Sequence, residues 1–223
     1  MSNSTQLIVF DWDGTLMDSE ARIVACLRAA IEETGLSHRT DEALRNIIGL
    51  GLREALVTLY PEGNDQQHDD LVKHYRHHFL ETNETPSPLF EGAESMIREL
   101  HAQGHFLAVA TGKGRNGLDK VLEETDLGEY FHYTRCADET HSKPHPQMLL
   151  EIMDWLGMEP VDTLMIGDTE FDLQMAHNAG VKALGVSYGV HDKERLLACE
   201  PLACLDSLAE VAEWLNTNVN KAA

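Results

Sequence analysis

Five short apolar runs, most of them ending in Asp or Thr, recur along the chain with amphipathic segments between them. The runs are Leu7–Asp11, Phe106–Thr111, Tyr133–Asp138, Thr163–Asp168 and Ala183–Tyr188. In the stretches Leu107–Ala110 and Leu164–Ile166 the apolar positions are continuous rather than alternating, which is typical of parallel strands buried on both faces. Segments such as Asn116–Thr125 and Gln147–Leu156 have the period of helices. Strands alternating with helices predict the α/β fold class, with a doubly wound parallel sheet.

The connection between the first two predicted strands is too long for one crossover. A strand–helix–strand unit needs roughly 30 residues, and Glu91–Gln103 has the pattern of its helix. Residues 18–87 contain helical patterns without a strong strand signal. We therefore expect a helical cap domain at 18–87, inserted into an α/β core domain formed by residues 1–17 and 88–223. Because ligands bind at the carboxyl ends of such sheets, the cap is expected to cover the site as a lid.

Carboxylates and anion-binding groups follow the first two predicted strands. Asp11 and Asp13 come after the first, and residues two apart in extended chain point to the same side. Two carboxylates this close repel each other unless a cation lies between them or one keeps its proton. Thr111 and Gly112 end the second strand, where a hydroxyl and free amides at a helix start suit an anion.

The later strands add a lysine and two more carboxylates. Lys143 follows the third strand, and Asp168 and Asp172 follow the fourth. Carboxylates are ligands of Mg²⁺, and the ion is commonly bound by protein carboxylates and substrate phosphate together. A lysine and helix-start amides would neutralise that phosphate, so the combination predicts phosphoryl transfer.

With these motifs the chain resembles the haloacid dehalogenase superfamily of phosphatases. The subfamily is the one with an inserted helical cap, which includes phosphoglycolate phosphatases and β-phosphoglucomutases. The motifs occur in the family's order: Asp11-Trp-Asp13-Gly-Thr15, Thr111-Gly112, Lys143-Pro144 and Gly167-Asp168-Thr-Glu-Phe-Asp172. The resemblance covers nearly the whole chain. It implies Mg²⁺-dependent hydrolysis of a small phosphorylated metabolite, with phosphoglycolate as the first candidate.

The resemblance also implies a role for each motif residue. Asp11 would attack phosphorus and form an aspartyl-phosphate. Asp13 would protonate the leaving alkoxide and then accept a proton from the hydrolytic water. An Asp at position 13 favours phosphate esters, because family members that act on other substrates lack it. The metal ligands would be Asp11, the Asp13 carbonyl, Asp168 and, as a ligand or near neighbour, Asp172. The phosphoryl group would be held by Thr111, the Gly112 amide and Lys143.

Other functions compete with this one. The segment Gly112–Gly117 fits a GxGxxG fingerprint, with Asp138 at the next strand end, so a nicotinamide-dinucleotide-binding oxidoreductase is an alternative. That interpretation leaves the other strand-end carboxylates unexplained. A sugar phosphomutase of the same family is a nearer alternative, because an aspartyl-phosphate can pass its phosphoryl group to a second hydroxyl. A receiver-type signalling domain also forms an aspartyl-phosphate, but it is much shorter and has no use for a cap.

Some polar residues remain ambiguous in the sequence. The insertion contains a histidine cluster, His68, His74, His77 and His78. It suggests a transition-metal site, but we prefer a solvated helix face because no carboxylate or Cys is placed to complete the ligand set. Arg53 either contacts a substrate carboxylate or second phosphate, or begins a surface helix. Lys113 either neutralises substrate or faces solvent.

Composition narrows the partners and the compartment. The chain has 223 residues, a formal charge of −21, 43% apolar and 25% charged residues, which is a globular composition. This negative charge argues against nucleic acid and anionic membranes. Four scattered cysteines and an N-terminal segment without basic residues lead us to expect no disulfide framework and no signal peptide. We expect a cytoplasmic monomer or homodimer that acts on a small molecule.

Overall fold

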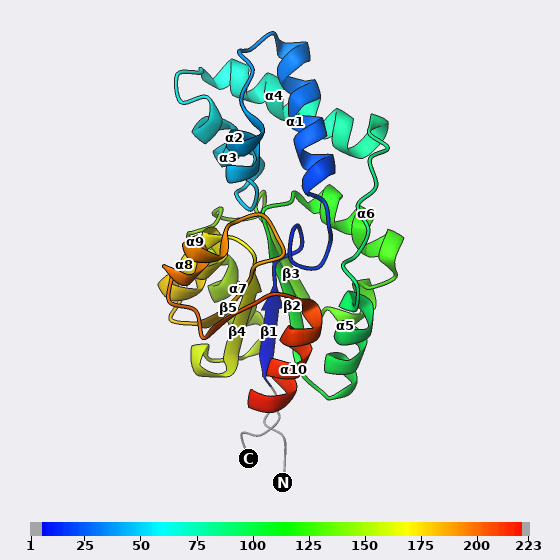
Figure 1. Cartoon of the computed structure of the whole chain (residues 1–223), viewed down its shortest axis with the longest axis vertical. Coiled ribbons are helices and arrows are strands. Elements are labelled where there is room, and N and C mark those ends of the chain that lie inside the picture. Colours follow the sequence, from blue (N-terminus) through cyan, green and yellow to red (C-terminus); the bar gives the residue numbers. More distant parts are fainter. Residues whose placement is uncertain (1–5, 220–223) are drawn as a thin grey trace.

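A parallel six-stranded sheet forms the centre of the computed structural model, which describes residues 6–219 (Figure 1). Its strand order is β3-β2-β1-β4-β5-β6, and each neighbouring pair is parallel. The strands are β1 (Leu7–Phe10), β2 (Phe106–Thr111), β3 (Tyr133–Cys136), β4 (Thr163–Gly167), β5 (Lys182–Val186) and β6 (Ala203–Leu205). The predicted doubly wound α/β fold is confirmed.

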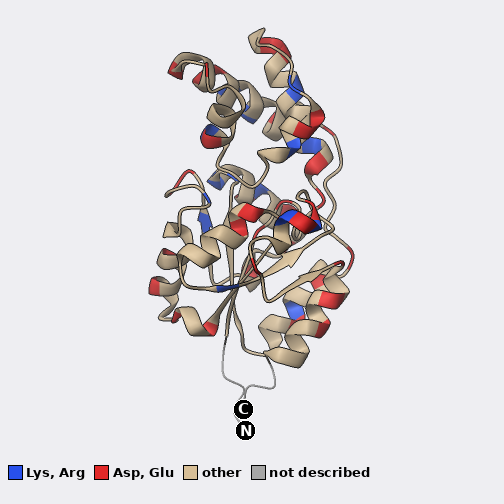
Figure 2. Ribbon diagram, turned by 60° about the vertical axis from the view of Figure 1, so that its left-hand side comes forward, with Lys and Arg blue, Asp and Glu red and all other residues tan. Residues whose placement is uncertain are grey.

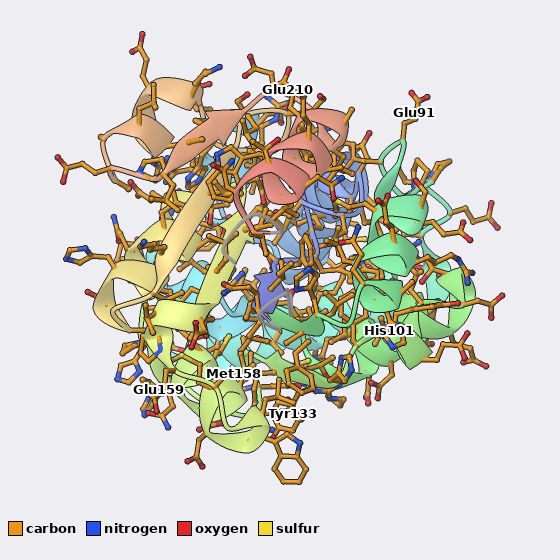
Figure 3. All side chains as sticks on the ribbon, turned by 90° about the horizontal axis from the view of Figure 1, so that it is seen from below. Glu91, His101, Tyr133, Met158, Glu159 and Glu210 are labelled. Carbon is orange, nitrogen blue, oxygen red and sulfur yellow. The ribbon has the colours of Figure 1, made fainter. Side chains whose placement is uncertain are left out.

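Helices cover both faces of the sheet, and this explains the continuous apolarity of the central strands. The core helices are α5 (Ala93–Ala102), α6 (Arg115–Thr125), α7 (Gln147–Leu156), α8 (Glu170–Asn178), α9 (Lys193–Leu197) and α10 (Leu208–Asn218), with short 3₁₀ turns η2 (Gly128–Tyr130) and η3 (Pro160–Asp162). In β1, Ile8 packs with residues of α5, α6 and α10, whereas Val9 packs with residues of α7, α8 and α9. In the view from the end opposite the cap, Glu210 of α10 and Met158 after α7 accordingly lie on opposite sides of the strands (Figure 3).

The insertion between β1 and α5 consists of helices. These are α1 (Glu20–Thr34), α2 (Asp41–Asn46), α3 (Leu52–Leu59), α4 (Asp65–His77) and the π-helical turn η1 (His78–Thr82), here called the cap helices. They share a hydrophobic cluster of their own, with Leu27, Leu56 and Leu71 at or near zero exposure. The cap helices lie above the end of the sheet where β1 leads into the insertion (Figure 1). The division into two domains with boundaries at 17/18 and 87/88 stays a prediction.

Two linkers connect the cap helices to the core, and they lie side by side. The Asp18 amide donates to the Pro88 carbonyl over 2.8 Å, and the Phe90 amide donates to the Leu16 carbonyl over 3.0 Å. An antiparallel bridge joins Met17 and Leu89 between these two hydrogen bonds. The chain therefore enters and leaves the insertion through one paired crossing.

Candidate active site

Asp11 lies directly after β1, at the carboxyl end of the sheet. Its carboxylate is buried, and Oδ1 accepts the Trp12 amide over 2.7 Å. Trp12 itself packs into the core, edge-on to Phe131, so the loop that presents Asp11 is fixed on one side. The other oxygen, Oδ2, is buried without a hydrogen-bond partner. A buried carboxylate oxygen left open in this way suits an additional ligand.

Lys143 joins Asp11 to Asp172. Its ammonium Nζ lies 2.8 Å from Asp11 Oδ1 and 2.7 Å from Asp172 Oδ1, and its side chain has 0% exposure. Burial opposes the charge of Lys143, but the two carboxylates raise its pKa above the ordinary value. Asp172, in the first turn of α8, is held at its second oxygen by the Thr169 amide and hydroxyl. Both oxygens of Asp172 are therefore engaged.

Asp168 follows β4 and completes the acidic cluster. Its Oδ1 accepts the Thr15 hydroxyl over 2.9 Å, and its Oδ2 accepts the Val190 amide over 2.8 Å. Gly14 has a φ of 79°, and a Cβ there would overlap the Asp168 carboxylate. The turn after Asp13 thus needs glycine both for its backbone conformation and for the approach of Asp168.

The acidic cluster, defined as Asp11, Asp168 and Asp172, fits a divalent cation. Oxygens from the three side chains lie within 4.8 Å of one another. Burial raises the pKa of Asp11 to about 7 although Lys143 lowers it, and burial with the neighbouring carboxylates raises the pKa of Asp168 well above its usual range. Three carboxylates beside one ammonium leave negative charge that a cation such as Mg²⁺ would balance.

Asp13 lies beside Lys113 at the edge of the cluster. Asp13 Oδ1 accepts the Ser19 hydroxyl and lies 2.8 Å from Lys113 Nζ. The Lys113 side chain is only 5% exposed, and its Nζ lies 4.4 Å from the centre of the Phe79 ring of η1. Lys113 consequently faces the site rather than solvent, which the sequence left open.

Thr111 and Gly112 end β2 at the same edge of the sheet. Thr111 is fully buried, and its hydroxyl accepts the Lys113 amide over 3.2 Å. A Cβ on Gly112 would lie 2.5 Å from the Leu50 carbonyl oxygen and 2.7 Å from that of Gly49. Only a residue without a side chain permits this close contact between the strand end and the cap.

The segment Ile47–Gly51, here called the cap loop, touches the core at a second point. The Gly51 amide donates to Ser142 Oγ over 2.7 Å, next to Lys143. The cap loop thereby contacts the Thr111-Gly112 motif and the residue that precedes Lys143. Its position over the strand ends agrees with the expected lid.

A cavity of about 450 Å³ lies between the cap helices and the core. Asp11, Asp13, Thr111 and Gly112 line its floor. Arg53 of α3 also lines the cavity, but its guanidinium is 46% exposed and pairs with Asp65 and Asp69. The structure thus brings the predicted site residues of all four motifs to one edge, with Arg53 on the far side of the cavity.

The histidine cluster is dispersed. His68 is buried and hydrogen-bonds the Tyr60 carbonyl, so it is not on a solvated face as expected. Carboxylates do lie beside the other three, contrary to expectation. Glu33 contacts His74 over 2.6 Å and His78 over 3.2 Å, and Glu81 contacts His77 over 3.1 Å. Within residues 6–219, however, the acidic cluster is the one set of three such ligands that converges.

The glycine fingerprint has a structural explanation. Asp138 Oδ1 accepts the Arg115 amide over 3.0 Å at the start of α6. A Cβ on Gly114 would approach the same carboxylate to 2.7 Å. Asp138 therefore caps a helix of this chain, where a dinucleotide-binding site would require it to face a ribose.

The sequence analysis did not predict the contribution of three residues to the site. Thr15 and Ser19 hydrogen-bond Asp168 and Asp13, and the Val190 amide supports Asp168. Thr15 belongs to a quoted motif, and its hydroxyl was a usable signal. Ser19 and Val190 lie in loops without periodicity, and nothing in their sequence neighbourhood indicates a partner.

Comparisons with known proteins agree with this geometry. The family model of the haloacid dehalogenase-like hydrolases matches residues 8–186. A protein of Dickeya dadantii named probable phosphatase IndB is 36% identical over 92% of this chain and 91% of its own length. A phosphoglycolate phosphatase of Vibrio vulnificus is 30% identical, covering 93% and 95%. The crystal structure of a hydrolase from Pseudomonas syringae shares the fold, with a TM-score of 0.87 at 22% identity and coverage of 96% and 99%.

The resemblance seen in the motifs is thus confirmed over most of the chain. The family match over most of the chain argues against the oxidoreductase and receiver alternatives. This chain belongs to the haloacid dehalogenase-like hydrolases.

Proposed function

We propose that the chain is a Mg²⁺-dependent phosphatase that hydrolyses a small phosphate monoester through an aspartyl-phosphate. One observation carries the proposal. The buried Asp11 carboxylate has one oxygen without a partner, lies beside Lys143, and lines the floor of a cavity. A nucleophile, a phosphate-neutralising cation and room for a substrate meet at this place.

The reaction has two steps at phosphorus. An Asp11 oxygen attacks, the bond from phosphorus to the ester oxygen breaks, and Asp13 gives its proton to the departing alkoxide. A water molecule then attacks the phosphoryl group, Asp13 takes up the water proton, and the bond from phosphorus to Asp11 breaks to release inorganic phosphate. Lys143, with the Thr111 hydroxyl and the Gly112 amide, would hold the transferring group.

Lys113 would contact both Asp13 and the substrate. In the substrate-free protein its ammonium pairs with Asp13 over 2.8 Å. An arriving phosphate dianion would compete with Asp13 for this ammonium, so that Lys113 could hold the phosphoryl group while Asp13 lies beside the leaving group.

The cation would be held by Asp11, Asp168 and the Asp13 carbonyl. Asp172 would act as a neighbour rather than a direct ligand, because Lys143 and Thr169 engage its oxygens. When bound, Mg²⁺ supplies positive charge that stabilises the developing negative charge on phosphorus.

Phosphoglycolate is the substrate suggested by the resemblance and by the name of the Vibrio relative, and a mutase remains the nearest alternative activity.

Within the described residues no helix has both the length and the apolarity to cross a bilayer. For the compartment we propose the cytoplasm, with which the four free cysteines accord.

The deciding experiment is an assay of purified protein with p-nitrophenyl phosphate. We expect phosphate release with Mg²⁺, loss with EDTA, and recovery on adding Mg²⁺. Asp11→Asn should lower turnover by about 10³-fold or more and keep the fold, because Lys143 retains Asp172. Asp18→Asn, an exposed neighbour in the same loop, is the matched control and should keep its activity. Normal turnover by Asp11→Asn would refute the proposed nucleophile.

A further inference from the structure

The size and lining of the cavity above the acidic cluster indicate which kind of leaving group it fits. This inference rests on the proposed function, because phosphate bound at Asp11 leaves the cap side of the cavity for the rest of the ester. A volume of about 450 Å³ is far larger than a two-carbon acid requires, and it falls in the range of about 300–1,000 Å³ typical of ligand pockets. The cap side is lined largely by apolar and aromatic side chains, among them Ile23, Leu27, Ile48, Val72, Tyr75 and Phe79.

Arg53 is the cation best placed on the cap side, and it already pairs with two carboxylates. Its Nη2 lies 2.8 Å from Asp65, and its Nη1 contacts Asp69. Both carboxylates raise the pKa of Arg53, with Asp69 the larger influence. One guanidinium between two carboxylates presents net negative charge to an approaching anion.

Two further cations line the cavity within the described part of the chain, and each also faces a carboxylate. Arg76 Nη2 lies 3.9 Å from Asp138 Oδ2, and Lys113 Nζ lies 2.8 Å from Asp13 Oδ1. A carboxylate or second phosphate on the leaving group would have to compete with these carboxylates for a cation. Otherwise it would be buried against an apolar wall without a counter-ion, at a large cost in free energy.

We propose that the natural substrate is the monophosphate ester of an uncharged alcohol with a large apolar part. The apolar wall would contribute binding energy in proportion to the area it covers. The paired arginines would select against esters whose leaving group carries a carboxylate or second phosphate. Phosphoglycolate would then be a poor substrate despite the name of the Vibrio relative.

Benzyl phosphate and phosphoglycolate test this directly, because both are esters of primary alcohols and differ in the charge and apolar area of the leaving group. We expect kcat/KM for benzyl phosphate to exceed that for phosphoglycolate by at least about tenfold, mainly through KM. Titration of both compounds into Asp11→Asn with Mg²⁺ present provides a binding readout that is independent of turnover.

Variants that release Arg53 should shift the preference. In Asp69→Asn, and more so in Asp65→Asn/Asp69→Asn, the ratio of kcat/KM for phosphoglycolate over benzyl phosphate should rise by about tenfold. Glu62→Gln removes a carboxylate from the distant pair with Arg39 and is the matched control, with no change in the ratio.

The possible failures are distinguishable. Hydrolysis of both esters with phosphoglycolate preferred overturns the inference and leaves the phosphatase proposal standing. An unchanged ratio in both Arg53-releasing variants overturns the selection by paired charges. Hydrolysis of neither ester, nor of p-nitrophenyl phosphate, refutes the proposed function and the inference with it.

Discussion

A fully buried lysine controls the charge of the site. Lys143 contacts Asp11 and Asp172 within 2.8 Å, and such a pair is stable only when each charge is satisfied. Asp11 and Asp172 share the ammonium of Lys143, and Asp11 Oδ2 remains free for phosphorus or a cation. The same arrangement thus orients the proposed nucleophile and keeps it from being neutralised completely.

Asp13 offers a test of proton transfer. Asp13→Asn cannot deliver a proton, so we expect alkyl phosphates to lose about 10²–10⁴-fold in kcat/KM. p-Nitrophenyl phosphate should lose less, because nitrophenolate leaves without a proton. The measurement is kcat/KM for both esters in the variant and in the unaltered protein.

Ser19→Ala is the control for this comparison. It removes one hydrogen bond to Asp13 but keeps the carboxylate, so its losses should be small and similar for the two esters. Equal losses in Asp13→Asn would argue that Asp13 only holds Lys113 in place.

Individual site residues were predictable to the extent that strand ends fix them. Asp11, Asp168 and Lys143 converge because the carboxyl ends of parallel strands meet at one edge. The position of Lys113 was not predictable, because the sequence of the turn after β2 does not indicate whether this side chain faces the site or solvent. Its ammonium lies between Asp13 and Phe79, a cap residue far away in sequence.

Among the elements, the cap loop is notable for lying directly on a strand end. The carbonyl oxygens of Gly49 and Leu50 leave no space for a Cβ on Gly112. Backbone atoms cannot rotate away as a flexible side chain can. Any side chain at position 112 therefore displaces either the cap loop or the phosphate-binding turn.

Gly112→Ala should for this reason impair catalysis more than folding. We expect kcat/KM to fall by about tenfold or more, because a displacement of about 1 Å at a reacting site costs up to about 10²-fold. Steady-state kinetics and thermal unfolding on the same sample measure the two effects separately.

Gly117→Ala is the matched control in the following helix, α6. Nothing lies within 4 Å of its added Cβ, and alanine is the better helix former, so stability should rise slightly with activity kept. Full activity in Gly112→Ala would show that the contact with the cap loop does not matter for turnover.

The elements themselves followed largely from hydrophobic pattern. Five of the strands agree with predicted runs to within two residues, and the central strands β1, β2 and β4 are buried on both faces. β6 was missed. It has three partly buried residues at the sheet edge, Ala203–Leu205, and too short an apolar run to exceed the background.

At the scale of the whole molecule, acidic residues are spread over both the cap helices and the core (Figure 2). A formal charge of −21 gives a field that repels phosphates from most directions. We expect the site to attract its anionic substrate locally, through Lys143, Lys113 and the proposed cation. The paired arginines of the cavity do not add to this attraction.

Stability of the whole chain should depend jointly on pH and Mg²⁺. Without metal, the pKa of Asp11 is about 7 and that of Asp168 is also raised above the unfolded value. The folded protein then binds more protons than the unfolded chain, so these groups favour folding as pH falls from 8 towards 5. Mg²⁺ needs the ionised carboxylates and competes with those protons.

The expected result is a larger rise in Tm with Mg²⁺ at pH 8 than at pH 6. One pH unit below the pKa of Asp11 its ionised fraction is about a tenth, so the apparent affinity for Mg²⁺ should fall by about tenfold. Thermal unfolding with and without Mg²⁺ at both pH values measures this. Asp11→Asn should reduce the pH dependence, and equal Tm increments in the unaltered protein would contradict the assignment of Asp11 as a ligand.

The paired linkers have a consequence for how such proteins diversify. Leu16 and Phe90, and likewise Asp18 and Pro88, are joined by single backbone hydrogen bonds. An insertion whose two ends meet in this way can be exchanged for another without rerouting the chain beneath it. Recombination at this crossing would exchange the cap side of the cavity together with the Ser19 contact to Asp13 and the Phe79 contact to Lys113. Chimaeras joined there are the natural starting point for redirecting the enzyme to new esters.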